Sequence, residues 1–222
     1  MVYSESTVKK LEQVLLGHNV KDVDVVILVP LRSVYSLICH FLAEDILEYK
    51  GFYNNAIINI AGKSVLVINI PQGIQAQDIF TILFRKKILF FGYGGSLYKQ
   101  YDVGKVFEVT IGVLPDGEKF YLNSTKAFPP VTGGYSPCML GELAEYYCEI
   151  SRNSQCHVVD MEIAYCASAA AQNKNIFTAW VMITDIPGEQ NFWEISDNLQ
   201  NEIKIGIDRV MNAIKEFIIE QG

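Results

Sequence analysis

Residues 158–186 read VVDMEIAYCASAAAQNKNIFTAWVMITDI, and this stretch decides the fold class. It opens with a short apolar run, continues as an alanine-rich helical segment over about residues 161–172, and ends in a second apolar run over residues 176–184. A strand, a helix and another strand in this order predict two parallel strands joined by a crossover helix. Ligands of such sheets bind outside the carboxyl ends of the strands. We therefore expect the acidic side chains of Glu162 and Asp185, one after each strand, to reach the same sheet edge.

The same alternation of strand and helix signals continues outward from this stretch. Apolar runs typical of buried strands lie at residues 23–29, 56–60, 64–70, 87–92, 105–114 and 157–160. Helical periodicity marks residues 7–16, 31–47, 74–85, 140–151 and part of 191–221, whereas residues 128–137 (FPPVTGGYSP) have the composition of a loop. The pattern predicts an α/β fold: a single domain over residues 1–222, with a mixed and mostly parallel twisted central sheet, helices on both faces and an extra N-terminal helix within residues 1–20.

Composition and charge exclude several classes of protein. Among the 222 residues, 50% are hydrophobic and 19% are charged, which supplies a sizeable core and argues against disorder. The net charge of −7 repels polyphosphate, so we expect no nucleic-acid partner. No apolar run approaches the roughly 18–20 residues that span a bilayer, and the N-terminal stretch lacks the apolar core of a secretory leader. The five cysteines include no C-x-x-C pair, so we expect reduced thiols, a cytoplasmic location and no membrane partner.

Common cofactor and metal motifs are incomplete. The sequence Gly-Lys-Ser at residues 62–64 has Ile57 where a phosphate-binding loop needs its first glycine, and it joins two predicted strands instead of opening a helix. The sequence Gly-Tyr-Gly-Gly at residues 92–95 has Leu97 where a dinucleotide fingerprint needs its third glycine. The three histidines are far apart in the sequence and form no known metal-ligand spacing. We therefore expect neither a cofactor nor a metal.

The acidic residues also have a purely structural interpretation. Asp160 and Glu162 could cap the helix that follows them, and Asp185 could cap the turn before Pro187. Residue types alone do not decide between capping and chemistry.

Taken together, the motifs resemble those of the nucleoside phosphorylase family, which includes the methylthioadenosine/adenosylhomocysteine nucleosidases. The resemblance runs from about residue 23 to the C-terminus and rests on Pro30-Leu31-Arg32, Pro71-Gln72-Gly73-Ile74, Gly92-Tyr93-Gly94-Gly95, Val103-Gly104-Lys105-Val106, Met161-Glu162 and Thr184-Asp185. It implies cleavage of the N-glycosidic bond of a purine-type nucleoside. It also implies a homo-oligomer that binds a nucleoside-like small molecule, with phosphate as a possible second substrate.

The resemblance implies a role for each matching residue. Glu162 would hold the ribose hydroxyls and favour the cationic transition state, with Met161 packed against the sugar. Asp185, next to Thr184, would protonate the departing base. Further substrate contacts would come from Gly92, Tyr93, Gly94 and Gly95, from Phe128 stacked on the base, and from Arg32 as an anion ligand.

The attacking group stays open at this stage. Tyr93 stands where the phosphorylases place a small hydroxyl residue, and Phe90 where they place a phosphate-binding arginine. Residues 31–35 hold no carboxylate where the nucleosidases keep a water-activating glutamate. Two further readings therefore remain beside the enzyme: a biosynthetic enzyme that uses the same pocket for another substrate, and a nucleoside-binding protein without catalysis.

Overall fold

The computed structural model describes residues 4–20, 22–138, 141–187 and 197–221. Its helices are α1 (Glu5–Leu16), α2 (Arg32–Leu42), the 3₁₀ helix η1 (Ile74–Thr81), α3 (Gly141–Asn153), α4 (Ile163–Gln172) and α5 (Asp197–Gln221). Its strands are β1 (Val25–Val29), β2 (Ile46–Lys50), β3 (Asn54–Ile60), β4 (Lys63–Asn69), β5 (Lys87–Ser96), β6 (Val106–Val113), β7 (Lys119–Tyr121), β8 (Pro130–Tyr135), β9 (Val158–Asp160) and β10 (Ile176–Asp185). Among the described residues, no helix is long and apolar enough to cross a membrane.

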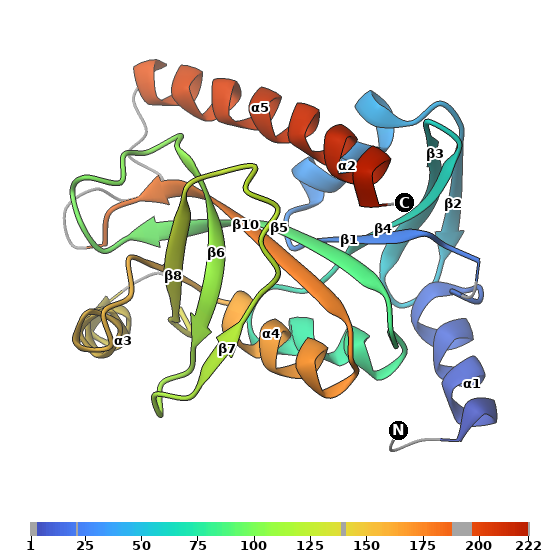
Figure 1. Cartoon of the computed structure of the whole chain (residues 1–222), viewed down its shortest axis with the longest axis horizontal. Coiled ribbons are helices and arrows are strands. Elements are labelled where there is room, and N and C mark those ends of the chain that lie inside the picture. The colour runs from blue at the N-terminus through green and yellow to red at the C-terminus, as the bar shows by residue number, and fades with distance from the viewer. Residues whose placement is uncertain (1–3, 21, 139–140, 188–196, 222) are drawn as a thin grey trace.

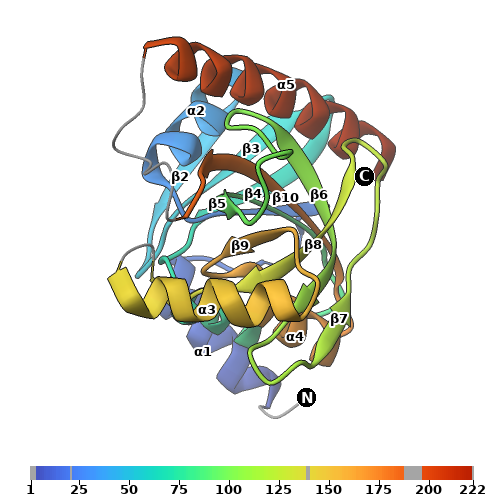
Figure 2. The same cartoon turned by 90° about the vertical axis from the view of Figure 1, so that its left-hand side faces the viewer.

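The strands form one continuous twisted sheet in the order β10-β6-β8-β9-β5-β1-β4-β3-β2, with β7 paired to β6. An additional pairing of β10 with β5 closes β5, β9, β8, β6 and β10 into a small barrel (Figures 1 and 2). The predicted parallel pair around residues 158–186 is not formed. Strand β9 is antiparallel to β5 whereas β10 is parallel to it, so β9 and β10 run in opposite directions.

The mixed sheet was predicted, but the expectation that it is mostly parallel is wrong. Five of the ten described strand pairings are parallel, and five are antiparallel. The antiparallel pairs come from the consecutive hairpins β2–β3–β4, from β6–β7, and from closure of the barrel through β5–β9 and β6–β10.

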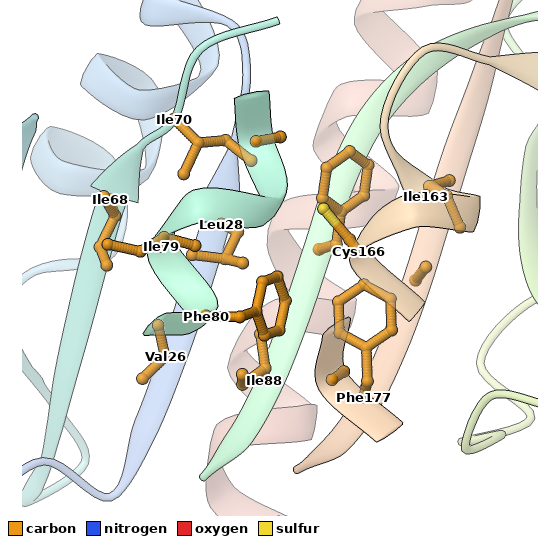
Figure 3. Close-up of a cluster of buried hydrophobic side chains, with 14 of the residues drawn as sticks. Val26, Leu28, Ile68, Ile70, Ile79, Phe80, Ile88, Ile163, Cys166 and Phe177 are labelled. Atoms are coloured by element: carbon orange, nitrogen blue, oxygen red, sulfur yellow. The ribbon is translucent and has the colours of Figure 1, made fainter. Parts of the chain in front are cut away.

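Helices cover both faces of the sheet, as predicted. Helices α2 and α5 lie on one face, and α1, η1 and α4 lie on the other (Figure 1). Strand β1 is covered by both helix layers. Its residues Val25, Ile27 and Val29 join the core under α2 and α5. Its alternate residues, Val26 and Leu28, join the opposite core, which Figure 3 shows. Side chains of a strand alternate between its two faces, so β1 is apolar throughout.

Two local predictions failed where tertiary pairing outweighs composition. The expected helix over residues 31–47 ends at Leu42, and Ile46–Lys50 becomes the edge strand β2 because β3 offers it an antiparallel partner. The stretch expected to be a loop, residues 128–137, contains the strand β8. Its glycines are required by crowding, since a Cβ on Gly134 would lie 2.3 Å from the Ser151 hydroxyl oxygen of α3.

The remaining differences are smaller. The expected helix over residues 74–85 is the 3₁₀ helix η1 and ends at Thr81, strand β5 continues to Ser96, and β7 was not predicted. The start of the C-terminal helix expected within 191–221, up to residue 196, and Leu140 at the expected start of α3 lie outside the described residues.

Candidate active site

A cavity of about 370 Å³ opens at the carboxyl ends of β1, β5, β9 and β10. Its walls also include the loop after β8, helix α3 and the side of α5, and Figure 2 shows α3 in front of the barrel strands. The residues that line it are Pro30, Leu31, Gln72, Tyr93, Gly94, Gly95, Ser136, Cys138, Ala144, Cys148, Val159, Asp160, Met161, Glu162, Thr184, Asp185, Pro187 and Ile203. The two predicted carboxyl groups therefore meet in one small cavity at the sheet edge, as expected.

The turn from β9 into α4 separates the roles of its two acidic residues. Asp160 caps the helix, because its Oδ2 accepts the backbone N–H groups of Ile163 at 2.9 Å and Glu162 at 3.3 Å. The side chain of Glu162 makes no capping hydrogen bond to the helix. Its Oε1 accepts the backbone N–H of Gly73 at 2.6 Å, and the side chain lines the cavity while only 4% exposed. The structural interpretation is correct for Asp160, whereas Glu162 faces the cavity.

Asp185 is presented by an irregularity at the end of β10. The register against β5 shifts between Ile183, which lies opposite Gly94, and Asp185, which lies opposite Gly95. The Thr184 hydroxyl donates a hydrogen bond to Asp185 Oδ1 at 3.0 Å, and the carboxyl group is 7% exposed. This places an almost buried carboxyl group at the cavity wall, with the Thr184 hydroxyl as its hydrogen-bond donor.

Burial raises the pKa of all three carboxyl groups in the cavity. The pKa of Asp185 is raised by desolvation, against which the Thr184 hydroxyl acts. The pKa of Glu162 is raised by desolvation and further by the negative charge of Asp160, while the Gly73 N–H lowers it. The pKa of Asp160 is likewise raised by desolvation and lowered by the two N–H groups that it caps. For Asp185, a raised pKa means that the carboxyl group keeps its proton closer to neutral pH, which suits a proton donor.

The structure brings most of the predicted site residues together. Met161, Thr184, Tyr93, Gly94 and Gly95 all line the cavity with the two acids. Tyr93 is the only aromatic residue in that wall among the described residues.

Three predicted contacts lie elsewhere. Arg32 begins α2 with an exposed side chain and is outside the cavity wall, although its neighbours Pro30 and Leu31 are part of it. Gly92 faces the protein interior, where a Cβ would lie 2.7 Å from the Phe90 ring. Its lack of a side chain therefore accommodates the core and not a ligand.

Phe128 was predicted to stack on the base, and the structure places it elsewhere. Its ring lies edge-on to Trp180 with centroids 5.1 Å apart, in the core under α5. The reason is the buried carboxylate of Glu108, which accepts hydrogen bonds from Ser124, Thr125 and Lys126. These bonds hold the loop that carries Phe128 against the α5 face of the barrel.

Sequence reasoning missed the wall formed by the β8–α3 region and α5. Its members are Ser136, Cys138, Ala144, Cys148 and Ile203. The Pro- and Gly-rich stretch that leads into this wall has the composition of a solvent loop, and the buried strand within it is recognisable only from its neighbours. Among the described residues, no group of three or more His, Cys, Asp or Glu side chains is placed to hold a metal.

Comparison with known proteins finds solved structures with the same fold. No protein-family model matches the sequence, and no curated protein matches it in sequence. The 5′-methylthioadenosine/S-adenosylhomocysteine nucleosidase of Helicobacter pylori, bound to butyl-thio-DADMe-Immucillin-A, matches with a TM-score of 0.75 and 15% identity over 88% of this chain and 99% of that chain. The futalosine hydrolase of Helicobacter pylori matches with a TM-score of 0.75 and 14% identity over 88% and 98%. The Neisseria meningitidis nucleosidase in complex with methylthio-immucillin-A matches with a TM-score of 0.72 and 14% identity over 87% and 100%.

Proposed function

We propose that this protein, which has the fold of those nucleosidases, cleaves the N-glycosidic bond of a purine-type nucleoside. The observation that carries the proposal is the meeting of Glu162 and Asp185 in one cavity of about 370 Å³ at the strand ends. Pockets for small molecules usually begin at about 300 Å³, so a nucleoside is an appropriate guest. Proteins of the same fold bind 5′-methylthioadenosine and immucillin inhibitors, which supports a ligand of this class.

The chemistry follows from the charges that develop. As the bond between sugar and base lengthens, the ribose becomes cationic and the base gains electrons. The Glu162 carboxylate can accept hydrogen bonds from ribose hydroxyls and stabilise the cationic sugar. Asp185 can deliver a proton to a ring nitrogen of the base, so that a neutral base departs. Glu162 and Asp185 thus act on opposite ends of the breaking bond.

Water is the attacking group that the cavity favours. Three carboxyl groups line it, and no Lys, Arg or His side chain does so among the described residues. Such a cavity disfavours a phosphate dianion. Water would add to the anomeric carbon as the C–N bond breaks, and the proton that water loses would replace the one given up by Asp185.

Product analysis tests this function. The protein is incubated with a panel of purine nucleosides that differ at the 5′ position, with and without phosphate, and free base is measured. We expect free base without phosphate, and no increase in rate when phosphate is added. Absence of free base for every member of the panel, with the protein folded, would contradict the proposal. A rate that requires phosphate would contradict the assignment of water.

A nucleoside-binding protein without turnover is the second candidate. Leu31 lines the cavity after β1, and residues 31–35 contribute no carboxyl group that could activate water. Calorimetry would select this candidate if adenosine-type ligands bind without release of base.

The assembly and the location are also proposals. We propose a homo-oligomer and a cytoplasmic location. The oligomer is supported by α2 and the following β2, which expose large apolar side chains: Phe41 is 66% exposed and Leu47 is 61% exposed. Sedimentation of the purified protein would show a single monomeric species if the oligomer proposal is wrong.

A further inference from the structure

Two hydrogen bonds hold Glu162, and the residues that form them, Asp160 and Gly73, are distant from each other in the sequence. Its backbone N–H is held by Asp160 Oδ2 at 3.3 Å, and its carboxylate Oε1 is held by the Gly73 N–H at 2.6 Å. The second bond joins residues 89 positions apart and ties the loop before η1 to the turn before α4. The first hydrogen bond fixes the position of the Glu162 backbone, and the second fixes the position of its carboxylate. Rotation of the side chain between these two points is therefore restricted.

Gly73 donates its N–H from a conformation that favours glycine. Its φ of 82° and ψ of −164° lie in a region that is essentially restricted to glycine. Space is not the obstacle, since a Cβ there would meet only Gln75 Oε1 at 3.4 Å and Met161 Cε at 3.8 Å. The direction of the N–H therefore depends on backbone conformation, and a side chain at this position would disturb the direction without creating a steric clash.

Asp160 is itself held in place. Its carbonyl oxygen accepts the Ser136 N–H at 2.9 Å, its carboxylate caps α4, and the residue is 6% exposed. A Cβ on Gly94 would lie 3.7 Å from the Asp160 Cβ, so β5 packs closely behind it. Its negative charge therefore stays close to Glu162.

We propose that Asp160 and Gly73 are positioning residues for Glu162: Asp160 holds a second carboxylate in the same turn, two residues before Glu162, and Gly73 fixes the Glu162 carboxylate through its N–H. The kinetic consequences rest on the proposed function, whereas the titration of Glu162 does not. Asp160 raises the pKa of Glu162 because two like charges oppose each other, and the Gly73 N–H lowers it because it stabilises the carboxylate.

Other groups around Glu162 are acidic or neutral. Tyr135 of β8 and Cys166 of α4 interact electrostatically with both carboxyl groups, and Asp185 lines the same cavity. No basic side chain among the described residues lines this cavity. Asp160 is therefore the charge whose removal should change the ionisation of Glu162.

Two substitutions should move the titration of Glu162 in opposite directions. Asp160→Asn keeps a side-chain oxygen for the Ile163 N–H but removes the charge, so Glu162 should ionise at a pH lower by about one unit or more. Gly73→Ala should disturb the N–H donor, so Glu162 should ionise at a higher pH. The measurement is a ¹³C NMR titration of carboxyl carbons in the ligand-free protein, with the Glu162 signal assigned from Glu162→Gln.

Asp24→Asn is the matched control. Asp24 also accepts a backbone N–H, from Ser64 at 2.8 Å, but it is exposed and lies outside the cavity wall. Its substitution should leave the Glu162 titration in place. An unchanged Glu162 titration in folded Asp160→Asn would overturn the proposal. If Asp160→Asn does not fold, a Glu162 titration in Gly73→Ala that stays constant or moves to lower pH would overturn it instead.

Failure of this inference is distinguishable from failure of the proposed function. If the native protein releases no base but Asp160→Asn shifts the Glu162 titration, the positioning role stands and the enzymatic function does not. If the native protein cleaves nucleosides, the acid side of the pH profile of kcat/KM should move to lower pH in Asp160→Asn together with the NMR midpoint. A lower rate with an unmoved profile would assign Asp160 to helix capping alone.

Discussion

The Thr184 hydroxyl donates a 3.0 Å hydrogen bond to Asp185 Oδ1 at the irregular end of β10. Both residues are almost buried, at 4% and 7% exposure. The bond stabilises the ionised form of a carboxyl group whose pKa burial otherwise raises. Threonine at this position therefore tunes the acid that is proposed to protonate the departing base.

Asp185→Asn should abolish turnover while the fold is kept. The amide has nearly the same shape and can still accept the Thr184 hydrogen bond, but it cannot donate a proton as an acid. We expect kcat to fall by about 10²- to 10⁴-fold. Circular dichroism and thermal unfolding should show a folded protein. A variant with near-normal kcat would remove Asp185 from the reaction.

Thr184→Val should change the pH dependence of the rate. Valine keeps the shape but removes the donor that lowers the pKa of Asp185, so this pKa rises further. A proton donor must be protonated, so the rate falls as pH increases through its pKa. The fall on the basic side of the profile should therefore move to higher pH in Thr184→Val. A shift to lower pH would contradict this assignment of the acid.

Glu162→Gln should weaken substrate binding as well as turnover. Glutamine still accepts the Gly73 N–H, so the side chain keeps its place, but the hydrogen bonds to the ribose lose their charge. Hydrogen bonds to charged groups contribute about 1.5–3 kcal/mol, so we expect kcat/KM to fall by about one to two orders of magnitude. Calorimetry with a nucleoside analogue should show weaker affinity. Unchanged affinity and rate together would show that Glu162 does not contact the ligand.

Two adjacent glycines of β5 should respond differently to alanine. A Cβ on Gly94 would lie 2.8 Å from the Val159 carbonyl oxygen, which cannot move without disturbing β9. A Cβ on Gly95 would instead lie 3.1 Å from Asp185 Oδ2 and 2.9 Å from the Pro187 ring. We expect Gly94→Ala to destabilise the fold by about 1–3 kcal/mol, and Gly95→Ala to reduce kcat more than stability. Urea unfolding and kinetics on both variants would show whether the two effects separate.

The sequence predicts the helical and sheet layers where apolar periodicity is strong. Strand β1 is a continuous apolar run, and its burial on both faces agrees with that pattern. The edge strand β2 and the barrel strand β8 could not be predicted, because their pairing partners and not their composition determine them. The antiparallel pairs that close the barrel have no local signal either.

The candidate site was predictable to the same extent. Glu162 comes two residues after β9 and Asp185 ends β10, and both reach one cavity as the sequence predicts. The predicted reason is wrong, because β9 and β10 run in opposite directions and do not share a parallel sheet edge. The displacement of Phe128 depends on Glu108, which is distant in sequence and binds its loop through hydrogen bonds that no residue pattern indicates. Gly73 lies 89 residues from Glu162, and its role as a donor is visible only in three dimensions.

Asn55→Ala should reduce stability without changing activity. Asn55 is 1% exposed on β3, where its amide donates to the carbonyl oxygens of Leu16 and Tyr53, each at 3.0 Å. Its Oδ1 lies 2.8 Å from His18 Nε2, so the side chain joins the end of α1 to the sheet. Alanine leaves these carbonyl groups without their donor, which costs about 1–3 kcal/mol of the free energy of unfolding. The exposed neighbour Asn54 provides the matched control, because Asn54→Ala should leave stability nearly unchanged. Urea unfolding measures the loss, and a parallel fall in kcat/KM at a temperature where the variant is fully folded would show that the region around α1 contributes to the cavity.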